Sequence, residues 1–290
     1  MNSVYIEITN VCNLNCSFCP CGKQPHGARE FMSSELFERC ISEASTVAEN
    51  VYFHVLGEPT LHPDFGQFLK KLEQTSLKLN LTTNGTTIGR VGELILASPT
   101  VRQVNFSTHA YAELPREQAQ AHLQDVLDFC KKANTIRPDL YINLRLWNVG
   151  DDESNSWNEA MLSKVGETFG NASEISLTHF CSRHKSFNVT GRIYLHQDSR
   201  FEWPELNNQA VNVAGTCRAL DTHVAILHDG RVVACCLDYS GQITLGNITN
   251  QSLIEILNSS VSKDLREGFE KHELHHPLCQ SCTFCKRFEK

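Results

Sequence analysis

The chain has 290 residues, of which 41% are hydrophobic, enough for one large domain or two medium ones with a sizeable core. It contains no apolar run of about 18 residues and no signal segment before residues 4–8, so we expect a cytoplasmic protein with no membrane partner. The formal charge of −7, without a basic run, argues against a nucleic-acid partner. In a reducing compartment, the thirteen cysteines favour metal ligands or catalytic thiols over disulfides.

The first half of the sequence alternates predicted strands and helices. Hydrophobic periodicity predicts strands at residues 4–8, 51–55, 77–81, 103–107, 140–146 and 174–178. The predicted helices between them cover residues 33–48, 65–72, 116–132 and 158–169, with a further helix around Val91, Leu94 and Ile95. Six such alternations predict an α/β fold with a parallel sheet, either open or closed into a barrel. In these folds ligands bind at the carboxyl ends of the strands.

The composition changes after about residue 182. Residues 182–215 show no clear period, which predicts a linker with local structure. Residues 223–227 and 231–234 flank Asp229-Gly230, a strong hairpin signal. Helical patterns follow near 253–257 and 261–269, and the chain ends in a second cysteine-rich segment. We therefore predict three parts: residues 1–181, a linker at 182–215, and a small domain at 216–290.

The first cysteine-rich segment directly follows the first predicted strand. Its thiols, Cys12, Cys16, Cys19 and Cys21, have the spacing C-x3-C-x2-C-x-C. Three of them could bind three corners of a cubic iron–sulfur cluster, which normally takes four cysteines. The fourth iron would then be open for chemistry. A four-thiolate zinc site with Cys21 as the last ligand is the alternative.

The pattern C-x3-C-x-Φ-C, with Phe18 as the aromatic residue, resembles the signature of the radical S-adenosylmethionine (radical SAM) superfamily. Four later segments resemble further family motifs in the expected order: "HVLGEPTLHPDF", "LTTNGT", "NFSTHA" and "LRLWN". The resemblance covers residues 4 to about 180 and implies a partial (β/α)6 TIM-type barrel. It implies that Cys12, Cys16 and Cys19 bind a [4Fe–4S] cluster whose open iron chelates SAM. The implied cofactor-binding residues are Phe18, Gly57, Glu58, Pro59, Asn84, Ser107, His109 and Arg145.

The sequence departs from the family pattern at two places. Leu56 precedes Gly57-Glu58 where the family usually has a second glycine, and His109 stands where an acidic residue is common. Simpler readings also exist for four residues. Glu58 could be a surface residue in a turn, and Arg145 could lie on a solvated strand face. Asn84 and Ser107 could simply cap strand ends.

The second set of cysteines resembles the Twitch domain, the shortened form of the SPASM domain that follows many radical SAM barrels. This resemblance implies one auxiliary [4Fe–4S] cluster, with a zinc site as the alternative. The implied ligands are Cys217, Cys235, Cys279 and Cys282, with Cys285 as an alternate to Cys279. Cys236 would then be a spare thiol, either a hydrogen-atom donor or a small buried residue.

The remaining cysteines have simpler expectations. Cys40 and Cys130 lie on apolar helix faces and are expected in the core. Cys21 is expected to be a spectator of the first cluster, and Cys181 has no assigned role.

The resemblance implies an enzyme that cleaves SAM reductively to a 5′-deoxyadenosyl radical and abstracts hydrogen from a peptide or a small polar metabolite. Both a peptide maturase or epimerase and a dehydrogenase fit this description. Because the chain starts at the first barrel strand, we expect no leader-recognition domain. The implied partners are the substrate and an electron donor such as flavodoxin or ferredoxin. The alternative from a different class is a non-catalytic zinc-binding interaction module.

Overall fold

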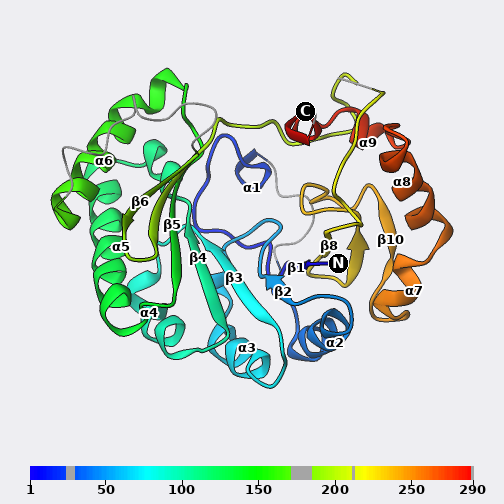
Figure 1. The fold of residues 1–290 in the computed structure, drawn as a ribbon, viewed down its shortest axis with the longest axis horizontal. Coiled ribbons are helices and arrows are strands. Elements are labelled where there is room, and N and C mark those ends of the chain that lie inside the picture. Colours follow the sequence, from blue (N-terminus) through cyan, green and yellow to red (C-terminus); the bar gives the residue numbers. More distant parts are fainter. Residues whose placement is uncertain (24–29, 171–184, 211–212, 289–290) are drawn as a thin grey trace. The chain divides into compact units, whose positions relative to one another are not determined.

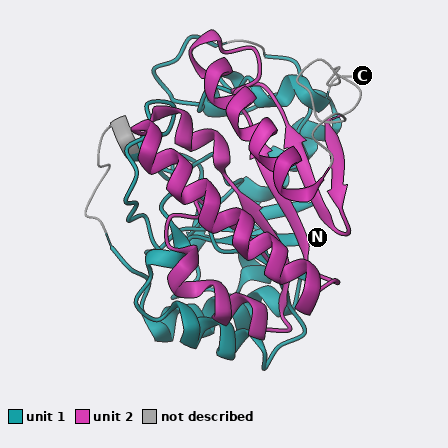
Figure 2. Ribbon diagram, turned by 90° about the vertical axis from the view of Figure 1, so that its left-hand side faces the viewer, with its two compact units in different colours: residues 1–79, 201–290 teal, residues 80–200 magenta. Residues whose placement is uncertain are grey.

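The computed structural model describes residues 1–23, 30–170, 185–210 and 213–288 (Figure 1). These residues form two compact units, coloured separately in Figure 2. Unit one comprises residues 1–79 and 201–290, and unit two comprises residues 80–200. No helix in the described part of the chain is long and apolar enough to cross a membrane.

Unit one joins the start of the chain to its end. Its strands are β1 (Ser3–Ile6), β2 (Asn50–Tyr52), β8 (His223–Ile226), β9 (Arg231–Val233) and β10 (Thr244–Asn247), with the first residues of β3 (Lys78–Thr83). Its helices are α1 (Pro20–Lys23), α2 (Ser34–Ser45), α3 (Phe65–Leu72), α7 (Leu253–Leu257), α8 (Ser260–Glu270) and α9 (Pro277–Gln280), and its short 3-10 helices are η1 (Pro59–Leu61) and η5 (Phe284–Phe288). Within this unit the strand order is β10-β9-β8-β1-β2-β3.

Strand β1 is the centre of unit one. It pairs in parallel with β2 on one side and with β8 on the other, with Val4 opposite both Val51 and Val224 (Figure 1). Val4 and Ile6 are completely buried, so they hold the strand by apolar burial as well as by backbone hydrogen bonds. The predicted hairpin is confirmed as β8–β9, but its pairing with β1 was not predicted.

Unit two repeats the strand–helix alternation. It contains the end of β3, then α4 (Ile88–Ala97), β4 (Val101–Phe106), η2 (Thr108–Glu113), α5 (Arg116–Ile136), β5 (Tyr141–Leu146), η3 (Asp152–Ser154), α6 (Asn155–Phe169), β6 (Ser186–Thr190) and β7 (Ile193–Gln197). Strand β5 runs parallel to both β4 and β7, while β6 returns antiparallel to β7. The α/β class and the parallel sheet predicted from the sequence are confirmed.

The end of unit two includes a predicted strand and part of the predicted linker. The predicted strand at 174–178 lies outside the described residues. The segment predicted as a linker contains the β6–β7 hairpin, and β7 pairs with β5. Strand β7 has the burial pattern of a half-buried strand, with Ile193, Leu195 and Gln197 inward. Its period-2 pattern spans only five residues, which is why the sequence did not reveal it.

Helix α2 illustrates how the outer layer is fixed. The Ser33 side chain accepts a hydrogen bond from the Leu36 backbone N–H and so caps the helix. The buried face of α2 includes Phe37 and Cys40, and Phe37 stacks on Phe68 of α3 with ring centroids 3.9 Å apart. Cys130 is likewise completely buried on α5. Both cysteines therefore occupy the core, as expected.

Gly57 gives a test of the fold where the β2 loop meets the β1 loop. Its φ is +72°, and a Cβ added there would lie 2.2 Å from the Thr9 carbonyl oxygen. Gly57→Ala should therefore lower the free energy of unfolding by at least about 1–2 kcal/mol from the backbone conformation alone. Thermal unfolding of the apoprotein measures this.

The matched control is Gly89→Ala in α4. Nothing lies within 4 Å of a Cβ at Gly89. Alanine there should raise stability by up to about 1 kcal/mol, because it favours the helix. Equal unfolding temperatures for Gly57→Ala and Gly89→Ala would contradict the close approach of the Gly57 backbone to the Thr9 carbonyl.

Candidate functional site

The loop after β1 presents the three thiols of the first motif at the carboxyl end of the strand. Cys12, Cys16 and Cys19 are all partly exposed, and the Cys19 N–H donates to the Cys16 carbonyl at 3.1 Å, which tightens the turn between them. The Val11 carbonyl accepts from the Glu58 N–H at 2.7 Å. The loop that carries the Gly-Glu-Pro motif is thus bonded directly to the cysteine loop.

The thiols of this loop influence one another. A hydrogen bond with Cys21 raises the pKa of Cys12, and burial and the charge of Glu58 raise it further. A group of thiolates in such surroundings is stable only beside a cation, because burial and like charges both favour the neutral form. The donor set therefore fits an iron–sulfur cluster. The Cys21 thiol itself donates to the Asn10 carbonyl at 3.5 Å.

Glu58 is not a surface residue. Its exposed fraction is 2%, and its side chain caps η1 by accepting a hydrogen bond from the Thr60 N–H at 3.1 Å. Its charge acts on Cys12, so the carboxylate lies near the first thiol of the loop. The simple turn interpretation is thus correct about the local geometry and wrong about the exposure. Pro59 follows as the first, buried residue of η1.

In unit two, Asn84 and Ser107 follow β3 and β4. The Asn84 Oδ1 accepts from the Thr86 N–H at 3.0 Å, which fits the simpler strand-end interpretation of this residue. The Ser107 N–H donates to the Thr83 carbonyl at 2.9 Å, while its side chain makes no capping bond to η2.

His109 is buried in the same unit. Its Nδ1 lies 3.2 Å from the Arg145 carbonyl oxygen. Burial lowers the pKa of His109 to about 4, so its imidazole is neutral at physiological pH. It can therefore contribute hydrogen bonds but no charge.

Arg145 belongs to a set of side chains that the sequence did not reveal. Its guanidinium lies over the Trp147 ring, 4.6 Å from the ring centre. The Trp147 indole N–H donates to His196 Nδ1 at 3.2 Å. The ring contact orients the guanidinium, which stays positively charged. Trp147 stands within the quoted "LRLWN" segment, whereas His196 lies on β7, inside the predicted linker.

The second set of thiols is assembled in unit one from segments far apart in the sequence. Cys217 precedes β8, Cys235 follows β9, and Cys279 lies on α9. Burial raises the pKa of Cys235 well above its ordinary value, and the charges of Cys236, Cys217 and Cys279 add to this. These sulfurs are therefore near neighbours, and the set fits an iron–sulfur cluster for the same reason as the first.

Cys282 and Cys285 complete this set. Burial raises the pKa of Cys279, and Cys217, Cys282 and Cys285 contribute further. Cys285 is buried and donates to the Cys282 carbonyl at 2.9 Å. The choice between Cys279 and Cys285 stays a prediction. Among the described residues, no three His, Cys, Asp or Glu side chains converge closely enough to hold a single metal ion.

Cys236 lies in a turn rather than on a strand. Strand β9 ends at Val233, and the Asp238 N–H donates to the Cys235 carbonyl at 3.2 Å. Burial raises the pKa of Cys236 to about 12, and a hydrogen bond with Tyr5 acts in the opposite direction. Cys236 also packs against an apolar cluster that includes Val233. Strand alternation, which would send adjacent side chains to opposite faces, therefore does not apply to it. Cys181, whose role the sequence left open, lies outside the described residues.

The turn after β9 begins with Cys235 of the second set and continues to Tyr239. Burial raises the pKa of Tyr239 to about 12, with contributions from its neighbour Glu205 and from Cys19 of the first set. Asp238 in turn acts on Cys279 of the second set. The Tyr239 hydroxyl donates to the Glu205 carboxylate at 3.2 Å, and its ring meets Trp203 edge-on. Within unit one, Tyr239 and Cys236 pack in one apolar cluster with Leu56, which precedes the Gly-Glu-Pro motif.

Comparisons with known proteins give two family matches. The family model of the radical SAM superfamily matches residues 6–148, and that of the SPASM iron–sulfur cluster-binding domain matches residues 217–286. A probable GTP 3′,8-cyclase from Pyrococcus horikoshii is 30% identical over 156 residues, covering 53% of this chain and 50% of that protein. The chain spans half or less of the length of the curated relatives it matches.

Solved structures share the fold. BtrN in complex with AdoMet and 2-DOIA superimposes with a TM-score of 0.57 at 14% identity, covering 98% of this chain and 93% of that one. The enzyme anSMEcpe with bound AdoMet and the Cp18Cys peptide gives a TM-score of 0.58 at 16% identity, covering 98% and 87%. These likenesses confirm the partial-barrel fold.

The two family matches imply the cofactors of the enzyme. A radical SAM domain carries a [4Fe–4S] cluster and SAM, and a SPASM domain carries auxiliary iron–sulfur chemistry. The two family matches give no support to the alternative of a non-catalytic zinc-binding module. The motif at Cys12, Cys16 and Cys19, the Gly-Glu-Pro loop bonded to it and both domain matches lead to one conclusion: the chain is an enzyme of the radical SAM superfamily with a SPASM iron–sulfur domain.

Proposed function

We propose that this enzyme abstracts hydrogen from a peptide or a small polar metabolite, as a maturase or epimerase or as a dehydrogenase. The observation that carries the proposal is the turn at residues 235–239, which begins with Cys235 of the second set and packs through Tyr239 in one apolar cluster with Leu56. Leu56 precedes the Gly-Glu-Pro motif, whose Glu58 N–H is bonded to the Val11 carbonyl of the first cysteine loop. When bound, the first cluster and SAM supply one electron and a 5′-deoxyadenosyl radical.

In this proposal the chain's own residues bind and orient the cofactor. Cys12, Cys16 and Cys19 hold three irons and leave the fourth for SAM. Glu58 accepts from the SAM ammonium, with Gly57 and Pro59 shaping its loop and Phe18 packing beside the cysteines. Arg145 pairs with the SAM carboxylate, and Asn84, Ser107 and the neutral His109 provide hydrogen bonds.

The second set of thiols would hold one auxiliary [4Fe–4S] cluster. Its proposed ligands are Cys217, Cys235, Cys279 and Cys282, with Cys285 as the alternate to Cys279. Such a cluster would accept one electron from the substrate radical, which gives net oxidation of the substrate and suits a dehydrogenase. The proposed electron donor to the enzyme is a flavodoxin or a ferredoxin.

The proposed substrate class is supported by what similar proteins bind or convert. They include GTP 3′,8-cyclases, a protein in complex with 2-DOIA and a protein in complex with a peptide. The molecules bound or converted by these proteins are of different kinds. Within this chain, the half-buried Trp203 and the Tyr239–Glu205 pair give the turn both apolar and hydrogen-bonding surface. This surface suits a polar molecule with some apolar area, either a peptide side chain or a small metabolite.

The first test counts irons. Two separate thiol sets predict about eight irons per chain. Replacing Cys12, Cys16 and Cys19 together with alanine should leave about four irons and abolish SAM cleavage, measured by iron analysis and 5′-deoxyadenosine formation. Cys21→Ser in the same loop is the control and should keep the full iron content. SAM cleavage by the triple variant would show that the first set is wrongly assigned.

The second test separates charge from capping at Glu58. Glu58→Ala should weaken SAM binding about ten- to a hundredfold, because a charge-assisted hydrogen bond contributes roughly 1.5–3 kcal/mol. Glu58→Gln keeps an oxygen for the Thr60 N–H but removes the charge, so it should weaken SAM binding while the protein stays as stable as the parent. Equilibrium dialysis with anaerobic protein measures the affinity. An unchanged affinity in both variants would place Glu58 outside the cofactor site.

The third test concerns Cys236. If its thiol donates hydrogen to the substrate radical, Cys236→Ala should keep its iron and cleave SAM but lose or divert the product. If the residue only packs, the variant should form normal product from a less stable protein. Loss of about four irons would instead make it a ligand. Cys235→Ala, the variant of the adjacent residue, should lose about four irons. Iron analysis measures this loss, and mass spectrometry identifies the product formed by Cys236→Ala.

A further inference from the structure

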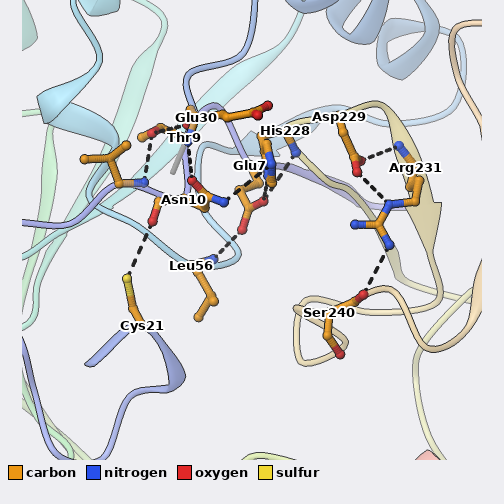
Figure 3. A network of polar contacts seen from close by, with 11 residues as sticks. Glu7, Thr9, Asn10, Cys21, Glu30, Leu56, His228, Asp229, Arg231 and Ser240 are labelled. Atoms are coloured by element: carbon orange, nitrogen blue, oxygen red, sulfur yellow. Dashed lines mark hydrogen bonds and ion pairs between the residues drawn. The ribbon is translucent and has the colours of Figure 1, made fainter. Parts of the chain in front are cut away.

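The turn of the β8–β9 hairpin carries a histidine toward the loop of the first cysteine set (Figure 3). His228 follows β8, and the Gly230 N–H donates to the Leu227 carbonyl at 2.9 Å to close the turn. Gly230 has a φ of +86°, and Asp229 accepts from the Arg231 N–H at 3.1 Å. The hairpin is therefore a rigid support for the His228 side chain.

His228 meets a buried carboxylate. Glu7 follows β1, and its side chain is only 2% exposed. Its Oε2 accepts from His228 Nδ1 at 2.7 Å and from the His228 backbone N–H at 3.3 Å. Its Oε1 accepts from the Leu56 N–H at 2.9 Å, which ties in the loop after β2. These hydrogen bonds offset the cost of burying the charge and fix Glu7 in one position.

The other nitrogen of His228 faces the start of the cysteine loop. His228 Nε2 lies 3.4 Å from Asn10 Nδ2. The Asn10 Oδ1 accepts from the Glu30 N–H at 2.7 Å, so the amide is oriented with its NH₂ group toward His228. With the amide in this orientation, an imidazole that donates from Nδ1 to Glu7 can accept at Nε2 from Asn10.

Asn10 and Glu30 bracket the cysteine loop at its two ends. Thr9 Oγ1 donates to the Glu30 carbonyl at 2.8 Å and accepts from the Val11 N–H at 3.0 Å. Asn10 is two residues before Cys12, and its carbonyl accepts from Cys21. A displacement of Asn10 would therefore move both ends of the segment that carries the three thiols.

We propose that His228 is a positioning residue for the first cluster. The His228 side chain, from the SPASM domain, contacts both Glu7 and Asn10 and so helps to fix the loop of Cys12, Cys16 and Cys19. This role is separate from any auxiliary cluster, and it rests on the proposed assignment of these three cysteines. Residues that orient metal ligands from behind commonly change metal affinity or activity about ten- to a hundredfold when replaced.

The two nitrogens of His228 can be tested separately. His228→Asn places an amide N–H near the former Nδ1 and retains the bond to Glu7. His228→Gln places an amide oxygen near the former Nε2 and retains only the contact with Asn10. His228→Ala removes both. Glu7→Gln keeps the size of the side chain but turns one acceptor into a donor that faces the His228 backbone N–H.

The readouts are the rate at which a chelator removes iron from the anaerobic protein, and the dissociation constant of SAM. His228→Ala and Glu7→Gln should release about four irons at least tenfold faster than the parent and bind SAM at least about tenfold more weakly. His228→Asn should lie nearest the parent and His228→Gln nearer to alanine, because the contact with Glu7 is shorter and involves a charge. The double variant His228→Ala/Glu7→Gln should release iron no faster, and bind SAM no more weakly, than the more affected of the two single variants.

His275→Ala is the matched control. This histidine lies in the same domain and contacts Asp264 and Glu273 at the surface. It should match the parent in both readouts. Parent-like iron release and SAM affinity in His228→Ala would overturn the proposal, as would His228→Gln retaining both properties better than His228→Asn.

Two further outcomes are a variant that does not fold and a parent protein that takes up no iron. Should His228→Ala fail to fold, as judged by circular dichroism, the order of the asparagine and glutamine variants decides alone. If the parent protein itself takes up no iron at Cys12, Cys16 and Cys19, the proposed function fails. If the parent takes up that iron and the His228 variants match it, only the positioning role fails.

Discussion

The parallel pairing of β1 with β8 is the contact on which the rest of unit one depends. It places a strand from the start of the chain beside one from residue 223 onward, in register from Ser3 opposite His223 to Ile6 opposite Ile226. Because both strands run in the same direction, the loops at their carboxyl ends leave the same edge of the sheet. The cysteine loop follows one strand and the His228 turn follows the other. The contact of the His228 turn with Glu7 and Asn10 follows from this pairing.

Close approach of backbones is the second constraint. Gly57 has no side chain because the Thr9 carbonyl occupies the space where a Cβ would lie. This contact lets the Glu58 N–H reach the Val11 carbonyl. The Gly-Glu-Pro motif is thus explained in part by packing: the glycine allows the approach, and the glutamate arrives next to Cys12 as a result.

The two sets of thiols show how a metal-binding protein can hold several cysteines close together. Burial and mutual proximity raise the pKa of Cys12, Cys235 and Cys279, so none of them favours the thiolate in the protein alone. A cationic iron core reverses this preference, and binding then releases protons and adds stability to the fold. Cys40 and Cys130 are also buried, but each lies in the core on a helix face and serves packing.

Local features of this protein could be predicted from the sequence, because each depends on neighbouring residues. The spacing of Cys12, Cys16 and Cys19, the hairpin at Asp229-Gly230 and the helix over Phe65–Leu72 depend on adjacent residues or on a short period. The α/β class followed from repeating such signals along the chain. The β6–β7 hairpin was missed because its strands are short and only partly apolar.

Only the tertiary structure decided which distant residues meet. Glu7 and His228 are separated by 221 positions, and nothing in either local pattern indicates the other. The same holds for Trp147 and His196, which meet because β5 and β7 pair with Arg145 opposite His196. A sequence records the chemistry of each residue, whereas the pairing of strands sets which residues become neighbours. The ligand types were therefore readable from the sequence, and the groups that hold them in place were not.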